Sequence, residues 1–199
     1  MSTRTTLRTT GVAVRAMLVL TLVLGVGYTL LVTGIGQLLL PWQANGSPLA
    51  GDKGSSLIGQ SFTDADGIAL PQYFQSRPSA AGDGYDGASS GGSNLGPENP
   101  DLITAIQERR SAIAEREGVK ESQVPADAVT ASASGLDPHI SVAYALLQVP
   151  RVAEARGLPE QDVRDLVESR IQGRDLGFLG EERINVAELN LALDEREGE

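Results

Sequence analysis

The chain has 199 residues, among them 16 basic and 26 acidic side chains, one histidine and no cysteine. Its net charge of −10 would repel the phosphates of a nucleic acid, and the lack of cysteine excludes disulfides and thiolate metal sites. Aromatic residues make up 4% of the chain, which is too few for a base-stacking platform or a carbohydrate cleft.

The first predicted element is a transmembrane helix over residues 16–40. No charged residue occurs from Ala16 to Gly51, and 14 of the 25 residues of the predicted helix are Leu, Ile or Val. At a rise of about 1.5 Å per residue this helix reaches ~37 Å, which is enough to cross a hydrocarbon core of ~30 Å. A cleaved signal peptide is the alternative, since Ala44 and Gly46 are small, but the apolar run of a signal is normally only about 7–15 residues long.

The charges that flank this helix predict its orientation. Three arginines and no acidic residue precede the helix, so the positive-inside bias places residues 1–15 in the cytoplasm. Residues 41–54 are then a juxtamembrane linker, in which Pro41 ends the helix and Trp42 suits the membrane interface. We expect residues 55–199 to form an extracytoplasmic domain and the chain to be a single-pass protein of the cell membrane, in contact with lipid.

Small or weakly polar residues recur at every fourth position of the predicted span and form a stripe along the helix. The stripe residues are Thr21, Gly25, Thr29, Thr33 and Gln37. Apolar side chains gain little from one another in lipid, so helices associate there through close backbone approach and interhelical hydrogen bonds, which such residues supply. The stripe predicts docking against a membrane helix of another chain, although threonines also bond to carbonyls of their own helix and glycine is common in membrane helices.

Beyond the membrane the sequence predicts one small domain. Residues 55–75 alternate short apolar pieces with turn residues, which is typical of short strands or irregular segments. Residues 79–97 are rich in Gly and Ser and predict a long loop, of a kind that is usually functional or disordered. Capping residues and apolar periodicity predict helices over residues 99–118, 141–157, 158–173 and 185–194. The predicted fold class is membrane-anchored α+β, with a single N-terminal transmembrane helix followed by one small mixed, helix-rich soluble domain.

Few residues suggest catalysis or metal binding. His139 is the single histidine, and the Asp-Pro-His sequence around it is typical of a turn that leads into a helix. The segment Asp64–Gly67 begins like a calcium-binding loop but lacks the third acid and the closing Glu. We therefore expect no catalytic residue, no metal site and no firmly bound cofactor.

Two other features suggest binding of a ligand or a partner. Residues 89–94 are similar to the Ser-Gly-Gly signature of transporter ATPases, which contacts a γ-phosphate, although the neighbouring charges are acidic. The candidate contacts are Ser90, Gly91, Gly92 and Ser93. Arg77 is the only basic residue between Lys53 and Arg109, and its guanidinium can hold a carboxylate through two hydrogen bonds. That carboxylate can belong to this chain or to a partner, so Arg77 is a structural anchor or a partner anchor.

Seven segments, spread in order over nearly the whole chain, resemble a known family. They read GQLLLPWQANGS (residues 36–47), GSSLIGQSF (54–62), YFQSRPSA (73–80), SGGSNLGPENP (90–100), VTASASGLDPHIS (129–141), QVPRVAEAR (148–156) and NVAELNLALD (185–194). In these segments the chain resembles the C subunit of the bacterial potassium-transporting P-type ATPase, the Kdp complex. Thr29 departs from this family, in which a proline commonly follows the membrane tyrosine, and it predicts a more continuous helix.

The resemblance implies a role in an ATP-driven, high-affinity potassium uptake complex. The implied partners are a potassium-channel-like subunit, a P-type subunit that hydrolyses ATP, and a small single-span subunit. The resemblance also implies a catalytic chaperone that raises the ATP affinity of the hydrolysing subunit, with residues 90–93 as nucleotide contacts and ATP present at the level of the complex. The predicted orientation conflicts with direct contact, because it places these residues outside, away from cytoplasmic ATP.

The sequence therefore favours a non-catalytic accessory subunit that is needed for assembly or stability. Its outer domain would cap the potassium entrance or stabilise the complex, and any effect on ATP affinity would travel through the membrane helices. Two alternatives stay open. One is a subunit that binds ATP directly, and the other is a stand-alone, membrane-anchored extracellular module that binds cations.

Overall fold

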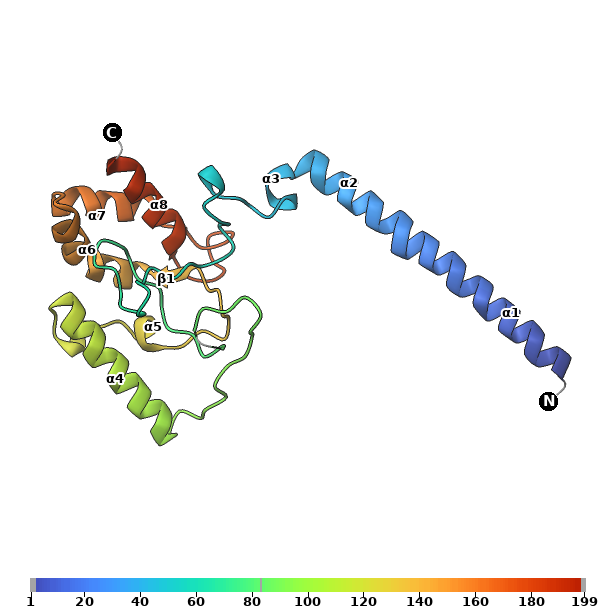
Figure 1. The fold of residues 1–199 in the computed structure, drawn as a ribbon, viewed down its shortest axis with the longest axis horizontal. Coiled ribbons are helices and arrows are strands. Elements are labelled where there is room, and N and C mark those ends of the chain that lie inside the picture. Colours follow the sequence, from blue (N-terminus) through green and yellow to red (C-terminus); the bar gives the residue numbers. More distant parts are fainter. Residues whose placement is uncertain (1–2, 83, 198–199) are drawn as a thin grey trace. The chain divides into compact units, whose positions relative to one another are not determined.

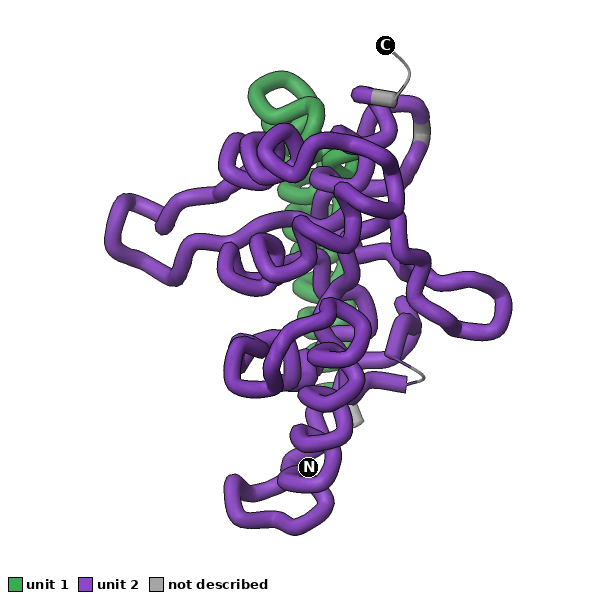
Figure 2. Tube along the Cα trace, turned by 90° about the vertical axis from the view of Figure 1, so that its left-hand side faces the viewer, with its two compact units in different colours: residues 1–48 green, residues 49–199 purple. Residues whose placement is uncertain are grey.

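The computed structural model describes residues 3–82 and 84–197. The chain divides into two compact units, residues 1–48 and residues 49–199, which Figure 2 shows in different colours. Each unit is held together by contacts of its own. Helix formation accounts for the structure of the first unit, and a hydrophobic core accounts for that of the second.

The first unit is one long helix followed by a short one (Figure 1). The long helix consists of α1 (Thr3–Leu20), the π-helical stretch η1 (Thr21–Tyr28) and α2 (Thr29–Leu39), and α3 (Pro41–Ala44) follows it. The stretch Thr6–Leu39 is long and apolar enough to cross a membrane, by length and composition alone. The helix continues through Thr29, as the sequence predicts, because the N–H of Thr29, which a proline would lack, bonds to the carbonyl of Val26.

The second unit is rich in helix and contains one small sheet. Its elements are η2 (Ala50–Asp52), α4 (Pro100–Glu117), η3 (Glu121–Gln123), α5 (Ala126–Val129), β1 (His139–Ser141), α6 (Val142–Arg156), α7 (Glu160–Ser169), β2 (Arg183–Asn185) and α8 (Val186–Glu197). The strands pair antiparallel with Ile140 opposite Ile184, and each runs directly into a helix. Figure 1 shows α6, α7 and α8 together at one end of the unit and α4 at the other. The expected helix-rich domain with a little sheet is confirmed.

Capping residues set the ends of α4 and α6 and the start of α8 where the sequence predicts them, whereas α7 begins without a side-chain cap and ends at Ser169, four residues before the predicted end at residue 173. The Asn99 side chain accepts hydrogen bonds from two amides in the first turn of α4, at 2.8 and 3.4 Å, and Gly118 ends this helix with a left-handed φ of 66°. The Ser141 hydroxyl accepts from the amide of Tyr144 at 3.0 Å and begins α6. Asn185 accepts from an amide in the first turn of α8 at 3.2 Å. Each cap pairs an amide that the helix itself leaves unbonded.

The core of the second unit lies where α6, α7, α8 and the two strands meet. Its fully buried apolar side chains include Tyr144, Val149, Val152, Val163, Val167, Ile184, Leu189 and Leu193. Helix α4 adds Ile113 and Ala114 to the same cluster. Full burial of a side chain such as Leu or Ile contributes about 1.5–3 kcal/mol, so these apolar helix faces stabilise the unit.

Residues 55–97 pack on this core with little regular structure. For residues 55–75 the sequence predicts short strands or irregular segments, and the structure shows irregular segments with an isolated bridge between Thr63 and Ala69. The Gly/Ser-rich loop is bound to the segment 131–135 on two sides. The amide of Ala80 donates to this segment at 2.8 Å, and the amide of Gly91 donates at 2.9 Å. The loop therefore belongs to the fold through its backbone, although it has few apolar side chains to bury.

Candidate functional site

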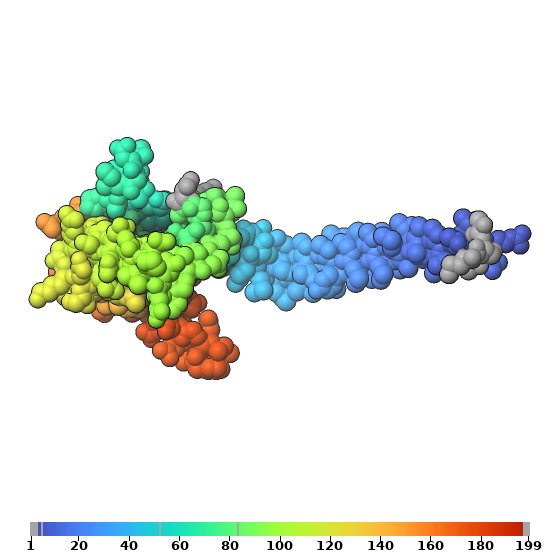
Figure 3. All heavy atoms as spheres, turned by 90° about the horizontal axis from the view of Figure 1, so that it is seen from below, coloured from blue at the N-terminus to red at the C-terminus, as the bar shows by residue number. Residues whose placement is uncertain are grey.

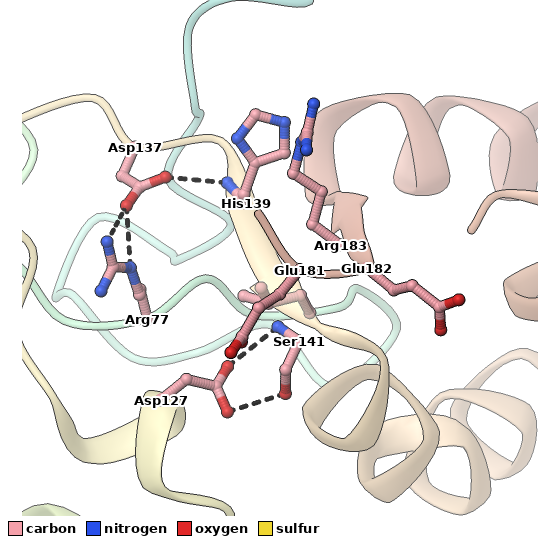
Figure 4. Close-up of a pocket in the computed structure, with 9 residues that line it drawn as sticks. Arg77, Asp127, Asp137, His139, Ser141, Glu181, Glu182 and Arg183 are labelled. Atoms are coloured by element: carbon pink, nitrogen blue, oxygen red, sulfur yellow. Dashed lines mark hydrogen bonds and ion pairs between the residues drawn. The ribbon is translucent and has the colours of Figure 1, made fainter. Parts of the chain in front are cut away.

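A polar pocket of about 320 Å³ lies beside the two-stranded sheet (Figure 4). It is lined by Arg77, Asp127, Asp137, His139, Ile140, Ser141, Glu181, Glu182 and Arg183. The strands β1 and β2 supply one wall, and α5 and the irregular segments around residues 77 and 137 supply the others. The pocket thus gathers the single histidine and two of the arginines into one place that the sequence pattern did not reveal.

Arg77 is anchored to a carboxylate of the same chain. Its Nε donates to Oδ2 of Asp137 at 2.8 Å, and a second guanidinium nitrogen donates to the same oxygen. The other oxygen of Asp137 accepts from the amide of His139 at 3.0 Å. Burial of the Asp137 carboxyl would raise its pKa, but the hydrogen bonds from His139 and Arg77 outweigh burial and hold the pKa below its usual value. The pair ties the segment before the Gly/Ser-rich loop to the start of β1.

The hydroxyl and the imidazole of the pocket have structural partners. Ser141 donates to the carboxylate of Asp127 at 2.7 Å and accepts from the amide of Tyr144 at 3.0 Å, so its hydroxyl is used on both sides to hold the start of α6. Burial and the nearby Arg183 lower the pKa of His139, which favours the neutral form of its ring. The arrangement favours a scaffold over a nucleophile and base.

The carboxylates of the pocket do not form a metal site. In Figure 4 Glu181 points toward Asp127, whereas Glu182 points away from the pocket. Asp137 is taken up by Arg77, as described above. Within residues 3–82 and 84–197, no group of three or more His, Asp or Glu side chains has the geometry to hold a metal ion. The pocket is a mixed-charge surface that suits contact with a polar partner.

The candidate nucleotide contacts at residues 90–93 are exposed on the loop. They adjoin a shallow hollow lined by residues 80–82 and 88–92, which are Ala, Gly and Ser. A triphosphate carries several negative charges, which protein sites normally balance with Lys, Arg or a metal ion. No basic side chain lines this hollow in the part of the chain that the structure describes, and Ser89 donates its hydroxyl to a carboxylate, Asp86, at 2.7 Å. Nucleotide binding here stays a prediction, carried by the resemblance alone.

The stripe of the first unit crosses the π-helical stretch η1. Hydrogen bonds from residue i to i+5 give a π-helix wider turns than the 3.6 residues of an α-helix. A step of four residues is slightly more than one turn of the α-helix α2, so the stripe rotates one way around the helix axis there. The same step is less than one turn of the π-helix η1, so the stripe rotates the other way. The two rotations partly cancel, and Thr21, Gly25 and Thr33 stay closer to one line than in a uniform α-helix. A straight line suits a straight partner helix.

Gln37, at the end of the stripe, pairs with a residue of its own chain. Its side-chain nitrogen donates to Oδ1 of Asn45 at 3.3 Å, and the Asn45 nitrogen donates back to Oε1 of Gln37 at 3.1 Å. Asn45 also donates to the carbonyl of Pro41 at 2.6 Å. The amide that the sequence assigns to a partner helix is thus already satisfied by the turn that follows α2, and its role in docking stays a prediction.

A segment without regular structure at residues 71–75, called the strap here, is the feature that sequence reasoning missed. Asn190 accepts from the amide of Phe74 at 2.9 Å and donates to the carbonyl of the same residue at 3.0 Å. Gln148 does the same for Gln75, at 2.7 and 3.1 Å. Both amide side chains are buried, at 1% and 0% exposure. Their signal in the sequence is a Gln and an Asn on apolar helix faces, where a buried polar group requires a partner.

Arginines hold the same strap at its other carbonyls. Arg151 donates to the carbonyl of Tyr73 at 3.1 Å, and Arg156 donates to that of Gln72 at 2.7 Å. Arg151 also binds the buried carboxylate of Glu117 at 2.9 Å. Helices α4, α6 and α8 are therefore joined through one polar network around the strap, which positions Arg77 two residues further on.

Comparison with known proteins decides the family. A sequence model of the family described as K⁺-transporting ATPase, c chain, matches residues 10–195. The chain belongs to this family, KdpC. Its relatives include proteins named potassium-transporting ATPase KdpC subunit. That of Beijerinckia indica is 50% identical over 184 residues (91% of this chain and 90% of the relative), and that of Kineococcus radiotolerans is 53% identical over 180 residues (89% and 88%). That of Nitratidesulfovibrio vulgaris is 52% identical over 189 residues (91% and 93%).

Membership in the KdpC family confirms the resemblance and sets the functional context. The family is a subunit of a K⁺-transporting ATPase, so the chain is part of a potassium-transport complex and has partner subunits. The features that matter for such a chain are its contact surfaces, and the structure offers the stripe of the first unit and the pocket of the second.

Proposed function

We propose that the chain is a non-catalytic accessory subunit of its potassium uptake complex, anchored in the cell membrane by the first-unit helix. Its N-terminus lies in the cytoplasm, and residues 55–199 lie outside. The observation that carries this proposal is the family match over residues 10–195, combined with a long apolar helix that bears small residues at every fourth position. The orientation rests on three arginines that precede the helix without a single acid.

The stripe docks against a membrane helix of a partner subunit. Gly25 lies in η1, where an added Cβ would meet only the Thr21 side chain, at 3.7 Å, so the surface there is open to a close neighbour. The partners are the channel-like subunit, the ATP-hydrolysing subunit and the small single-span subunit. The outer domain caps the potassium entrance or stabilises the assembly, and the described chemistry of its pocket supports a binding role over catalysis.

An effect on ATP affinity, if the chain has the chaperone role of its family, is indirect. Because residues 90–93 lie outside the membrane, the chain affects ATP affinity through its membrane helix. It does so by stabilising one state of the complex more than another. Such couplings are typically about 1–3 kcal/mol, which corresponds to a roughly 5–150-fold change in affinity. The neutral and acidic surroundings of residues 90–93 support this route over direct contact with ATP.

Docking is tested by Gly25→Leu combined with Thr29→Leu in the full-length chain, produced together with its partner subunits. We expect the recovery of partner subunits on a tagged chain to fall, because two leucines hold the neighbouring backbone away. Val23→Phe with Leu31→Phe is the matched control, since it enlarges the opposite side of the same helix. Equal recovery for the two double variants would remove the docking argument.

The orientation is tested by Ser93→Cys, which gives the chain its sole thiol on an exposed loop. A membrane-impermeant maleimide should label this thiol in intact spheroplasts, while Thr6→Cys should react only in inverted vesicles. Labelling of Ser93→Cys in inverted vesicles alone would place the loop in the cytoplasm. That result would reverse the proposal in favour of the subunit that binds ATP directly.

A further inference from the structure

Three arginines of the second unit line one pocket, which is called the arginine pocket here. The pocket has a volume of about 250 Å³, and its polar lining residues are Ser76, Arg77, Arg109, Arg116 and Tyr144. No acidic side chain lines it in the part of the chain that the structure describes. The polar pocket beside the sheet shares only Arg77 with it. In a chain of net charge −10, a pocket whose charged lining is entirely basic points to a negatively charged ligand.

Two hydroxyl groups of the arginine pocket lack a hydrogen-bond acceptor. The Ser76 hydroxyl is buried and has no partner among the described residues. Tyr144 is only 1% exposed, and its hydroxyl oxygen accepts from a guanidinium nitrogen of Arg116 at 2.8 Å. Within residues 3–82 and 84–197, the proton of the Tyr144 hydroxyl has no acceptor. Buried polar groups are normally satisfied, so the two hydroxyls indicate that the pocket takes an acceptor from outside the chain.

The guanidinium groups also keep donors that the fold does not use. Arg109 gives one nitrogen to a backbone carbonyl at the end of α5, at 3.1 Å, and it forms no ion pair with the described residues. Arg116 donates through Nε to Glu117 at 2.7 Å, and Arg77 is bound to Asp137. A guanidinium has more N–H groups than these bonds require. All three arginines can therefore donate to a ligand while they keep their present partners.

The arginine pocket is accessible from solvent. The side chains of Arg77 and Arg116 are each 28% exposed, and Figure 3 shows α4, in yellow-green, at the surface of the second unit. The remaining walls include the apolar residues Pro78, Ile113 and Ala128. A ligand can thus enter without unfolding of the domain, with an anionic end against the arginines and an apolar end against these walls.

The charges and the walls favour a carboxylate over a phosphate. Arg77 and Arg116 each hold a carboxylate already, so the surplus positive charge comes mainly from Arg109. A phosphate group carries about −1.5 to −2 near neutral pH, whereas a carboxylate carries a single charge and matches the planar fork of a guanidinium. We infer that the arginine pocket binds a carboxylate attached to a short apolar group. The carboxylate belongs to a small organic acid or to a partner subunit, and only the second source rests on the proposed function.

Binding is measured by fluorine NMR, with trifluoropropanoate titrated into the full-length chain in a neutral detergent. The uncharged trifluoropropanamide has a similar shape and should not bind. Arg109→Gln should weaken binding of the carboxylate about tenfold, because it removes a charged donor. Arg174→Gln removes the same charge from an exposed position outside the pocket and should leave binding unchanged. Equal affinities for the two variants, or equal binding of the amide and the carboxylate, would overturn the inference.

A second pair of variants tests the location without removing a polar contact. Ala112 and Ser111 are both exposed on α4, but only Ala112 lines the arginine pocket. Ala112→Glu should weaken binding of trifluoropropanoate about tenfold or more, because its carboxylate competes as a tethered ligand. Ser111→Glu adds the same charge one residue away and should change the affinity by less than about twofold. The melting temperatures of both variants should match, and an equal loss of binding in both would refute the location.

The assembled complex separates the two sources of the carboxylate. If a partner subunit supplies it, the isolated chain binds trifluoropropanoate and the complex does not. If a small organic acid is the ligand, the isolated chain and the complex both bind the probe. Either result supports the site. A chain that recovers no partner subunit would refute the proposed function, whereas an isolated chain that does not bind the probe would refute this inference, so the two failures are distinguishable.

Discussion

Replacement of Asn190 by leucine tests whether the strap at residues 71–75 is held mainly by side-chain amides. The buried Asn190 satisfies both the N–H and the carbonyl of the fully buried Phe74. Leucine has a similar volume but leaves both groups without a partner, at about 1–3 kcal/mol each. The apolar surface of the leucine returns about 1–2 kcal/mol. Taken at the middle of each range, the net loss in the free energy of unfolding is about 2–3 kcal/mol.

The assay is urea unfolding of the full-length chain in detergent, followed by near-UV circular dichroism of the tyrosines. At about 1–3 kcal/mol per molar urea, the midpoint for Asn190→Leu should fall by roughly 1–2 M. Gln161→Leu on the exposed face of α7 is the control, and its stability should stay within about 0.5 kcal/mol of wild type. Asn190→Leu with a midpoint equal to that of the control would show that packing of Phe74, and not the amide, holds the strap.

Three further variants test the pocket and the loop. The pKa of Asp137 lies below its unfolded value of about 3.9, so its contribution to stability is complete above that pH and is lost as pH falls through the lower folded pKa. Asp137→Asn should therefore be less stable than wild type near neutral pH, with a gap in the unfolding free energy that narrows in acid; a constant gap would contradict the pairing with Arg77. The folded pKa of His139 lies below its unfolded value of about 6.5, so the unfolded chain binds the proton first as pH falls. The wild type therefore loses stability as pH falls from about 6.5 toward the folded pKa. His139→Gln should flatten this part of the curve of stability against pH. In Gly135→Ala the new Cβ would lie 1.9 Å from the carbonyl oxygen of Asp86, and the forced shift should cost about 1–3 kcal/mol in a melting experiment, whereas an unchanged melting temperature would mean that the loop yields freely.

Helix positions could be predicted from the sequence because their signals are local. Asn99 bonds to amides two and three residues ahead, and Ser141 bonds to an amide three residues ahead, so each cap and its partner stand within one turn. The charge-free run before Pro41 is likewise a local property. The π-helical stretch η1 carries no comparable signal, since it differs from its surroundings only in which carbonyl each amide bonds to.

The contacts within the pocket are harder to predict from the sequence than the helix ends. The sequence predicts that Arg77 holds a carboxylate, because an isolated guanidinium near aromatic residues and a proline needs a partner. The partner, Asp137, lies 60 residues away, and nothing in the residues between them distinguishes it from the other acids. Pattern reasoning can therefore state that a bond exists, but the fold is needed to say with which residue.

The strap lies beyond sequence reasoning for a physical reason. Gln148 and Asn190 reach segments 73 and 116 residues away, and both bind the backbone of the strap, not its side chains. A backbone N–H and carbonyl are the same in every residue except proline, so the strap sequence does not record that it is bound. The information lies wholly in the helices, as an amide placed where the helical period calls for an apolar residue. A Gln or Asn on an otherwise apolar helix face is therefore best interpreted first as one partner of a long-range hydrogen bond, and only then as a tolerated polar residue.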